Sequence, residues 1–225
     1  MFGNTLAVDA GKAVKAAGGT VLGEVKHPLG TTDMSSPLLQ AQASGADVIG
    51  LANAGPDLVN TIKQAREFGI PGVASFLVFT NNVVSLGLEA AQGIRMPVSF
   101  YWDLNDDTRA WAKRLMARNG NVLPTMGHAA AYVSTMHYLR AVEKAGTDEA
   151  GAVDKAMKEL PITGGMLGNA RMQANGRVVM DMYLVEVKSP KESKGPADIY
   201  KVLGTIPGET LFTPAAKSGC PLTAG

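Results

Sequence analysis

The sequence predicts an α/β fold in which a parallel sheet is flanked by helices. Two observations lead to this prediction. Amphipathic helical stretches alternate with short apolar runs through the N-terminal part of the chain, as in sheets whose strands are joined by right-handed crossovers. The clearest example is residues 47–69, where a buried strand, a turn of small residues and a capped helix follow one another.

The chain opens with a predicted helix at residues 5–17, which has an apolar stripe and is ended by two glycines. Residues 20–26 are rich in β-branched side chains and are predicted to form a strand. A short helix is then expected from Ser36, with Pro37 in its first turn, to residue 44.

Residues 47–52 are mostly apolar, as expected for a parallel strand that is covered on both faces. A turn of small residues follows, and Pro56 suits the first turn of a helix that continues to Phe68 and is ended by Gly69. Ligands of open α/β sheets bind outside the carboxyl ends of the strands. Residues 53–57 are therefore the first candidate binding surface.

The alternation continues beyond this helix. Residues 73–79 are apolar and are predicted to form a strand, followed by a polar turn at 80–82. Residues 83–91 suit a short helix that contains Gly87, and residues 93–100 form the next predicted strand.

A second set of helices is expected after residue 100. Two acidic residues open an amphipathic helix at 106–119, and the Asn, Gly and Pro residues at 119–124 mark a boundary. A long helix is predicted at 127–145. Thr147 is the expected cap of a further helix at 148–159.

The C-terminal part is predicted to contain a hairpin and returning strands. Asn175-Gly176 is a strong hairpin turn signal. Residues 177–188 then read as a largely buried strand, and a short strand is expected near 200–202 before an irregular tail.

Composition excludes several classes of protein. Nearly half of the 225 residues are hydrophobic, so the chain can bury a real core. The net charge is +1 and aromatic residues are few, which gives no case for nucleic acid or a membrane surface as partner. No apolar run approaches the roughly 20 residues needed to span a bilayer, and the first residues of the chain as given show no secretory signal.

The residues offer no catalytic constellation and no cofactor or metal site. The glycine cluster at 164–168 lacks the spacing of a dinucleotide-binding turn, and the three histidines lack metal-ligand spacing. Among the histidines, His128 is the candidate for a ligand contact, because it lies at the start of the helix that follows the boundary at 119–124. A purely structural role is the alternative. Cys220 is the single cysteine, read either as an inert thiol or as the partner of a cysteine outside this chain.

Several strings, taken in order, resemble the type I periplasmic solute-binding proteins of ABC transporters, in the branched-chain amino acid group. The strings are Phe2-Gly3 before the first helix, Asp33-Met34-Ser35-Ser36-Pro37-Leu38-Leu39, Gln64-Ala65-Arg66-Glu67-Phe68-Gly69, Ala91-Gln92-Gly93 and Ala130-Ala131-Tyr132. Each string alone is weak, and their order and spacing carry the resemblance from Phe2 to about Val187.

The resemblance implies a two-lobe α/β fold that closes around a solute and docks on a membrane permease. It implies that residues 1–124 form lobe two, that residues 125–168 are helices of lobe one, and that residues 169–225 are return strands and tail. Lobe one is then only partly present, and the chain is expected to be a truncated, periplasmic member. The helices at 127–159 would expose apolar surface and favour association.

Residues carried over by position from this family form a candidate ligand wall. They are Phe2, Asn53, Ala54, Phe76, Phe79, Thr80 and His128. Amino-acid binders of the family place an acidic residue near Phe76, whereas residues 75–82 contain no acid. A buried ammonium without a carboxylate is costly. We therefore expect a small amino acid or an organic acid as ligand. A ligand with an uncharged amine or no amine, such as an aromatic or aliphatic carboxylate, is favoured, with Phe76 and Phe79 against its apolar body.

Two other functions stay open at this point. A sensor or regulator could use the same two-lobe fold without a transporter, and a DNA-binding or membrane-spanning segment elsewhere would indicate it. An enzyme on an α/β fold is the third reading, and activity lost on changing His128 would indicate that function.

Overall fold

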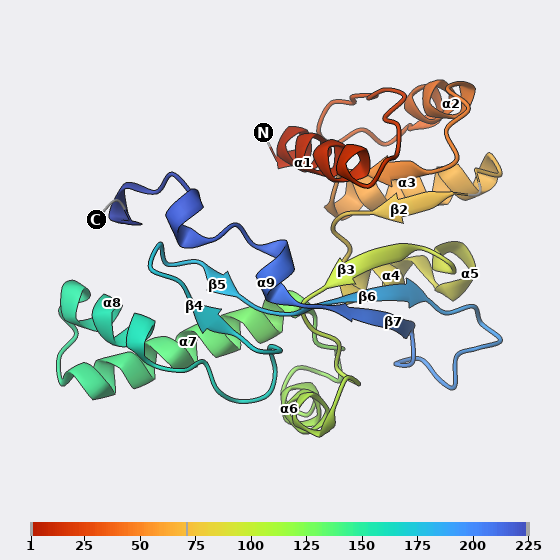
Figure 1. Cartoon of the computed structure of the whole chain (residues 1–225). Coiled ribbons are helices and arrows are strands. Elements are labelled where there is room, and N and C mark those ends of the chain that lie inside the picture. The colour runs from red at the N-terminus through yellow and green to blue at the C-terminus, as the bar shows by residue number, and fades with distance from the viewer. Residues whose placement is uncertain (1, 71, 224–225) are drawn as a thin grey trace. The chain divides into compact units, whose positions relative to one another are not determined.

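The computed structural model describes residues 2–70 and 72–223 (Figure 1). The chain divides into two compact units, which we call unit 1 (residues 1–97 and 185–201) and unit 2 (residues 98–184 and 202–225). The chain therefore passes between the units three times, after residues 97, 184 and 201. The lobe boundaries implied by the family resemblance stay a prediction.

The helices of the described residues follow in chain order. They are α1 (Phe2–Ala16), α2 (Ser35–Ala43), α3 (Gly55–Glu67), α4 (Thr80–Leu86), α5 (Leu88–Ala91), α6 (Asp106–Met116), α7 (Met126–Ala145), α8 (Ala150–Glu159) and α9 (Gly208–Leu211), with 3-10 turns at Ala215–Lys217 and Pro221–Thr223. The strands are β1 (Ile49–Leu51), β2 (Val73–Ser75), β3 (Arg95–Val98), β4 (Arg171–Met172), β5 (Val178–Val179), β6 (Met182–Val187) and β7 (Tyr200–Ile206).

The strands confirm the predicted α/β class. One sheet has the order β1-β2-β3-β6-β7, and β1, β2 and β3 pair in parallel. The register of the first pair aligns Ile49 with Val73 and Leu51 with Ser75. Parallel neighbours end at the same edge, so residues after β1 and after β2 meet there.

The core of unit 1 lies between helices and the first strands. Met34, Leu38, Ala65 and Ile70 form a buried cluster against which Ile49, Phe68 and Val73 pack. Helix α3 supplies the largest share of buried side chains in this unit, including Leu58 and Ile62, which are 0% and 1% exposed. Gly69 takes a φ of +66° directly after α3, which confirms the predicted glycine stop.

Two buried clusters form the core of unit 2. One gathers Phe100, Trp111, Ala129, Val133 and Met166 from α6, α7 and the flanking loops. The other joins α7 to α8, the helix pair that lies side by side in Figure 1, through Ala141, Val153 and Ala156. The long helix therefore packs on both neighbours, and Gly146 ends it with a φ of +66° as predicted.

The predicted strand at residues 20–26 does not form. The segment has no regular structure, and its apolar side chains Val21, Leu22 and Val25 are 43%, 56% and 37% exposed. β-branched residues favour an extended backbone, but a strand needs a partner ladder and a buried face. In the described sheet the neighbour of β1 is β2, so residues 20–26 gain neither.

Three further predicted elements have different boundaries. The strand expected at 73–79 ends at Ser75, and the polar turn expected at 80–82 is the first turn of α4, where Asn82 Oδ1 accepts the Phe79 N–H at 3.0 Å. Gly87, with a φ of +76°, separates α4 from α5 within the helix expected at 83–91. Short polar side chains that cap backbone groups can begin a helix as readily as a turn.

The strand expected at 177–188 is also divided. The predicted hairpin does form, with β4 antiparallel to β5 around Gly176. The chain then leaves the ladder at Asp181, whose N–H donates to the Gly168 carbonyl at 2.8 Å and whose Oδ1 accepts the Gly208 N–H at 2.9 Å. These non-local bonds replace the pairing that a continuous strand would need.

Candidate functional site

The candidate site of unit 1 lies where β1 and β2 end. Asn53 and Ala54 follow β1, and Phe76 follows β2, where its N–H donates to the Leu51 carbonyl at 3.1 Å. The start of α1 approaches the same edge, because a Cβ added to Gly3 would lie 2.9 Å from the Ala52 carbonyl oxygen. The structure thus brings the segments carrying four predicted site residues to one edge: Phe2, Asn53, Ala54 and Phe76.

The Asn53 amide is held in one orientation. Its Nδ2 donates to Thr61 Oγ1 at 2.8 Å and lies 3.2 Å from His27 Nε2, while the Thr61 hydroxyl donates to the Asp57 carbonyl at 2.7 Å. Because the hydroxyl proton is used on that carbonyl, Thr61 can only accept from Asn53. Among residues 2–70 and 72–223, the buried Asn53 Oδ1 finds no hydrogen-bond partner.

Ser75 provides a second buried polar atom at the same edge. It is the last residue of β2, it is 1% exposed, and within the described chain its Oγ has no hydrogen-bond partner. A buried polar group left without a partner costs about 1–3 kcal/mol. The register places Ser75 beside Leu51, two residues before Asn53. Two neighbouring strand ends therefore each carry a buried polar atom that has no partner among the described residues.

The two phenylalanines and Thr80 differ in burial and in local structure. The Phe76 ring covers Gly50, since a Cβ on that glycine would lie 2.6 Å from the ring. Phe79 is partly buried and precedes α4, and Thr80 is buried at the first position of that helix. Phe76 and Phe79 thus offer partly exposed apolar surface, whereas Thr80 belongs mainly to the helix start.

Asp57 is the carboxylate in the first turn of α3 near this edge. It is 5% exposed, and its Oδ2 accepts the Gly30 N–H at 3.0 Å. The amino end of a helix favours a negative charge. These contacts occupy the carboxylate in holding residue 30 and the helix start, so it stabilises the local fold.

His128 lies in unit 2, at the third position of α7. Its Nδ1 accepts the Thr125 N–H at 3.1 Å, and Thr125 Oγ1 accepts the His128 N–H at 3.4 Å. This is a capping box in which a histidine takes the place usually held by Glu or Gln. The Thr125 N–H fixes Nδ1 as an acceptor, so the neutral ring carries its proton on Nε2.

Sequence reasoning missed His27 and Ser75. His27 follows residues 20–26, which form no strand, and its place beside Asn53 is a non-local contact for which the sequence carries no local signal. Ser75 was read as part of an apolar run, because its unsatisfied hydroxyl appears only once β2 is paired with β1. The lobe-two positions predicted from the family, by contrast, included Asn53 and Phe76.

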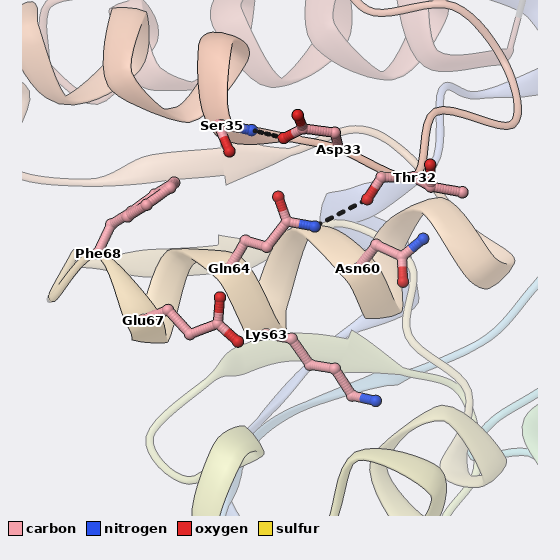
Figure 2. Close-up of a pocket in the computed structure, with 8 residues that line it drawn as sticks. All are labelled: Thr32, Asp33, Ser35, Asn60, Lys63, Gln64, Glu67 and Phe68. Carbon is pink, nitrogen blue, oxygen red and sulfur yellow. Dashed lines mark hydrogen bonds between the residues drawn. The ribbon is translucent and has the colours of Figure 1, made fainter.

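A separate open groove of about 460 Å³ lies between α3 and the segment before α2 (Figure 2). It is lined by Thr32, Asp33, Ser35, Asn60, Lys63, Gln64, Glu67 and Phe68. The hydrogen bonds made by its lining residues hold the segment before α2 against α3. Gln64 Nε2 donates to the Thr32 carbonyl at 2.8 Å, Gln64 Oε1 accepts the Met34 N–H at 2.7 Å, and Asp33 Oδ1 accepts the Ser35 N–H at 2.9 Å. None of the predicted ligand residues lines this groove.

Residues 2–70 and 72–223 contain no group of three or more His, Cys, Asp or Glu residues placed to hold a metal ion. Within residues 2–70 and 72–223, no helix combines the length and the apolar character that crossing a bilayer requires.

Comparison with known proteins identifies the family of this chain. A family model described as periplasmic binding protein matches residues 1–196, and the chain belongs to that family. This confirms the resemblance noted from the sequence strings. Among curated proteins, none matches the chain.

Solved structures of periplasmic binding proteins match almost the whole chain. A periplasmic binding protein from Burkholderia mallei is 45% identical with a TM-score of 0.92, covering 98% of this chain and 59% of that one. A branched-chain amino acid ABC transporter periplasmic ligand-binding protein from Burkholderia xenovorans is 37% identical with a TM-score of 0.88, covering 99% of this chain and 60% of that one. The chain thus spans about 60% of the length of these proteins.

A more distant structure shares the fold. A solute-binding protein of an ABC transporter from R. palustris, in complex with 4-hydroxybenzoate, is 24% identical with a TM-score of 0.76 and covers 89% of this chain and 57% of that one.

Proposed function

We propose that this chain is the solute-binding component of an ABC importer and that it binds a small organic acid at the edge where β1 and β2 end. The observation that carries the proposal is the pair of unsatisfied polar atoms, Asn53 Oδ1 and Ser75 Oγ, on neighbouring strand ends. A protonated or hydroxyl-bearing ligand group can donate to the first, and the Ser75 hydroxyl can donate to a ligand carboxylate.

The apolar surface of this edge supports an aromatic or aliphatic body for the ligand. Phe76 and Phe79 are partly exposed, and residues 75–82 hold no carboxylate for an ammonium group. The nearby Asp57 already accepts the Gly30 N–H. Two solute-binding proteins with the same fold have been solved in complex with benzoate and with 4-hydroxybenzoate, which supports such a ligand.

The remaining parts of the proposal come from the family. We assign a membrane permease as the partner and the periplasm as the location, since the similar proteins from the two Burkholderia species are periplasmic and one is an ABC transporter component. Phe2 is a further proposed ligand contact at this edge, and a ligand-facing role for His128, which lies in unit 2, stays a prediction from the family resemblance. The sensor alternative has no specific observation in its favour.

The test measures melting temperature with benzoate, 4-hydroxybenzoate, leucine and valine. A ligand that binds only the folded state stabilises it by about 2.7 kcal/mol at a concentration 100 times its Kd. We expect a rise with the aromatic acids, and a loss of that rise in Ser75→Ala and Asn53→Ala. The matched control is Asn60→Ala. Asn60 lies on α3, the helix that follows Asn53, but it lines the separate open groove between α3 and the segment before α2.

Two results would count against the proposal. A rise with leucine or valine alone would keep the transport function and overturn the ligand class. An equal rise in all variants would move the binding site away from the β1–β2 edge.

A further inference from the structure

Unit 2 contains a second cavity that the function above does not use. It has a volume of about 200 Å³ and lies between α6, α7 and the loop at 163–166. Its lining includes one row of side chains from each helix, Asp107, Trp111 and Arg114 from α6, and Tyr132, Met136 and Arg140 from α7. The volume is below the roughly 300 Å³ at which pockets for drug-sized molecules begin, so it suits a small molecule.

The floor of this cavity is aromatic and rigid. Trp111 is 5% exposed and meets the Phe100 ring edge-on, with centroids 5.3 Å apart and an interplanar angle of 84°. Trp111 also contacts Tyr132, with ring centroids 5.6 Å apart. Tyr132 is 43% exposed. A buried ring therefore supports an exposed one, which gives a flat ligand a surface that is already ordered.

The charged side chains of the cavity have different roles. Arg140 donates to Thr163 Oγ1 and so holds the loop. The Asp107 carboxylate lies against Gly165, where an added Cβ would come within 1.9 Å of Oδ2. Arg114, by contrast, makes no ion pair or hydrogen bond with any residue that the structure describes. Two arginines and one aspartate give the lining a net charge of +1.

Arg114 is placed to bind an external anion and is too far along α6 to pair with Asp107. The two residues are seven apart on α6, which is about 10 Å along a helix that rises 1.5 Å per residue. Trp111 lies one turn from Arg114, so the guanidinium is a neighbour of the aromatic floor. A guanidinium recognises a carboxylate through two parallel N–H donors.

We propose that this cavity is a binding site for a small carboxylate with a flat apolar body, with the carboxylate on Arg114 and the body against Tyr132 and Met136. The site is made of unit 2 residues alone. It does not depend on the ligand edge of unit 1.

The test uses the fluorescence of Trp111, which lines the cavity, to report ligand binding. The chain has two tryptophans, so Trp102→Phe leaves Trp111 as the single emitter. In that background, benzoate is titrated while tryptophan fluorescence is recorded, beside benzamide, which has the same ring without the charge, and acetate, which has the charge without the ring. We expect a saturable change with benzoate and at least tenfold weaker apparent affinity for the other two.

Arg114→Gln is the decisive variant, because the side chain is exposed and can be changed without breaking a described contact. We expect this variant to bind benzoate with an apparent affinity at least tenfold weaker than that of the parent. Arg118→Gln is the matched control, a nearby exposed arginine that does not line the cavity, and it should stay within twofold of the parent. Far-UV circular dichroism and the melting temperature check that each variant is folded.

Several outcomes would overturn this site. One is the absence of a saturable change, and another is equal binding of benzamide or acetate. A change that survives Arg114→Gln but disappears in Ser75→Ala would place the response at the edge of unit 1 instead. Conversely, a normal response in Ser75→Ala would leave this site standing even if the function proposed above failed.

Discussion

At the scale of single residues, one of the strings that resemble the family, Gln64-Ala65-Arg66, is explained by bonds that hold unit 1 together. In Gln64-Ala65-Arg66, the glutamine amide binds the backbone of residues 32 and 34, and Ala65 is 1% exposed in the core. Arg66 donates through Nε to the Ala90 carbonyl at 3.0 Å and through Nη2 to the Gln92 carbonyl. One short string thus ties α3 to the segment before α2 and to the end of α5.

Replacing Arg66 with Gln should therefore destabilise unit 1 by about 2 kcal/mol. Hydrogen bonds from a charged group contribute roughly 1.5–3 kcal/mol, and the shorter glutamine amide would reach neither carbonyl. The measurement is urea unfolding followed by far-UV circular dichroism, since both tryptophans lie in unit 2 and would not report on this unit. Lys63→Gln, an exposed change on the same helix, is the control. Equal losses in the two variants would contradict the role given to the two carbonyl bonds.

At the scale of elements, caps decide where helices begin, and they limit what the sequence can predict. The sequence favoured Thr147 as the cap before α8, but the helix begins at Ala150 and Glu149 caps it. The Glu149 carboxylate accepts the Gly151 N–H at 2.9 Å and the Ala152 N–H at 2.7 Å. A glutamate is not among the preferred caps, so propensity alone selected the wrong residue.

These two bonds predict a pH dependence for α8. The Gly151 N–H, followed by the Ala152 N–H, lowers the pKa of Glu149 below its ordinary value of 4.5. The ionised form is thus favoured in the folded state, and its stabilisation is complete above 4.5 and is lost as the pH falls through the lowered pKa. Glu149→Gln should be less stable than the parent at pH 7, and this difference should shrink in acid.

Urea unfolding followed by tryptophan fluorescence measures this effect, because Trp102 and Trp111 lie in the same unit as α8. Glu143→Gln, an exposed change on α7, provides the comparison. If the loss of stability in Glu149→Gln were the same at every pH, the contribution of the carboxylate charge to the cap would be refuted.

The elements that the sequence predicted well are those with local signals. Gly69 and Gly146 end α3 and α7, and Asn175-Gly176 turns the hairpin, because a positive φ suits glycine wherever it occurs. The strand expected at 20–26 failed because strand formation depends on a distant partner. For the same reason the sequence indicated Asn53 at the site but could not show that its Oδ1, or Ser75 Oγ, would lack a partner.

At the scale of the whole molecule, the structure leaves large apolar side chains exposed on its longest helix. On α7, Tyr132, Tyr138 and Leu139 are 43%, 44% and 51% exposed. Tyr132 and Leu139 are seven residues apart and so share one face of the helix. The sequence led us to expect apolar surface on this helix, and contiguous apolar surface on a protein favours contact with another molecule.

We therefore expect the chain to self-associate as its concentration rises, with the α7 face contributing. Leu139→Lys places a charge on the face that Tyr132 and Leu139 share, and the desolvation of an unpaired ammonium would oppose burial between copies. Sedimentation velocity over a range of concentrations should show a smaller rise in average mass for Leu139→Lys than for the parent. Val84→Lys is the control, because it adds the same charge at a side chain on α4 that is 53% exposed. It tests whether added charge alone is enough to reduce association. If both variants reduced association equally, net charge would be the cause and the α7 face would have no special part in it.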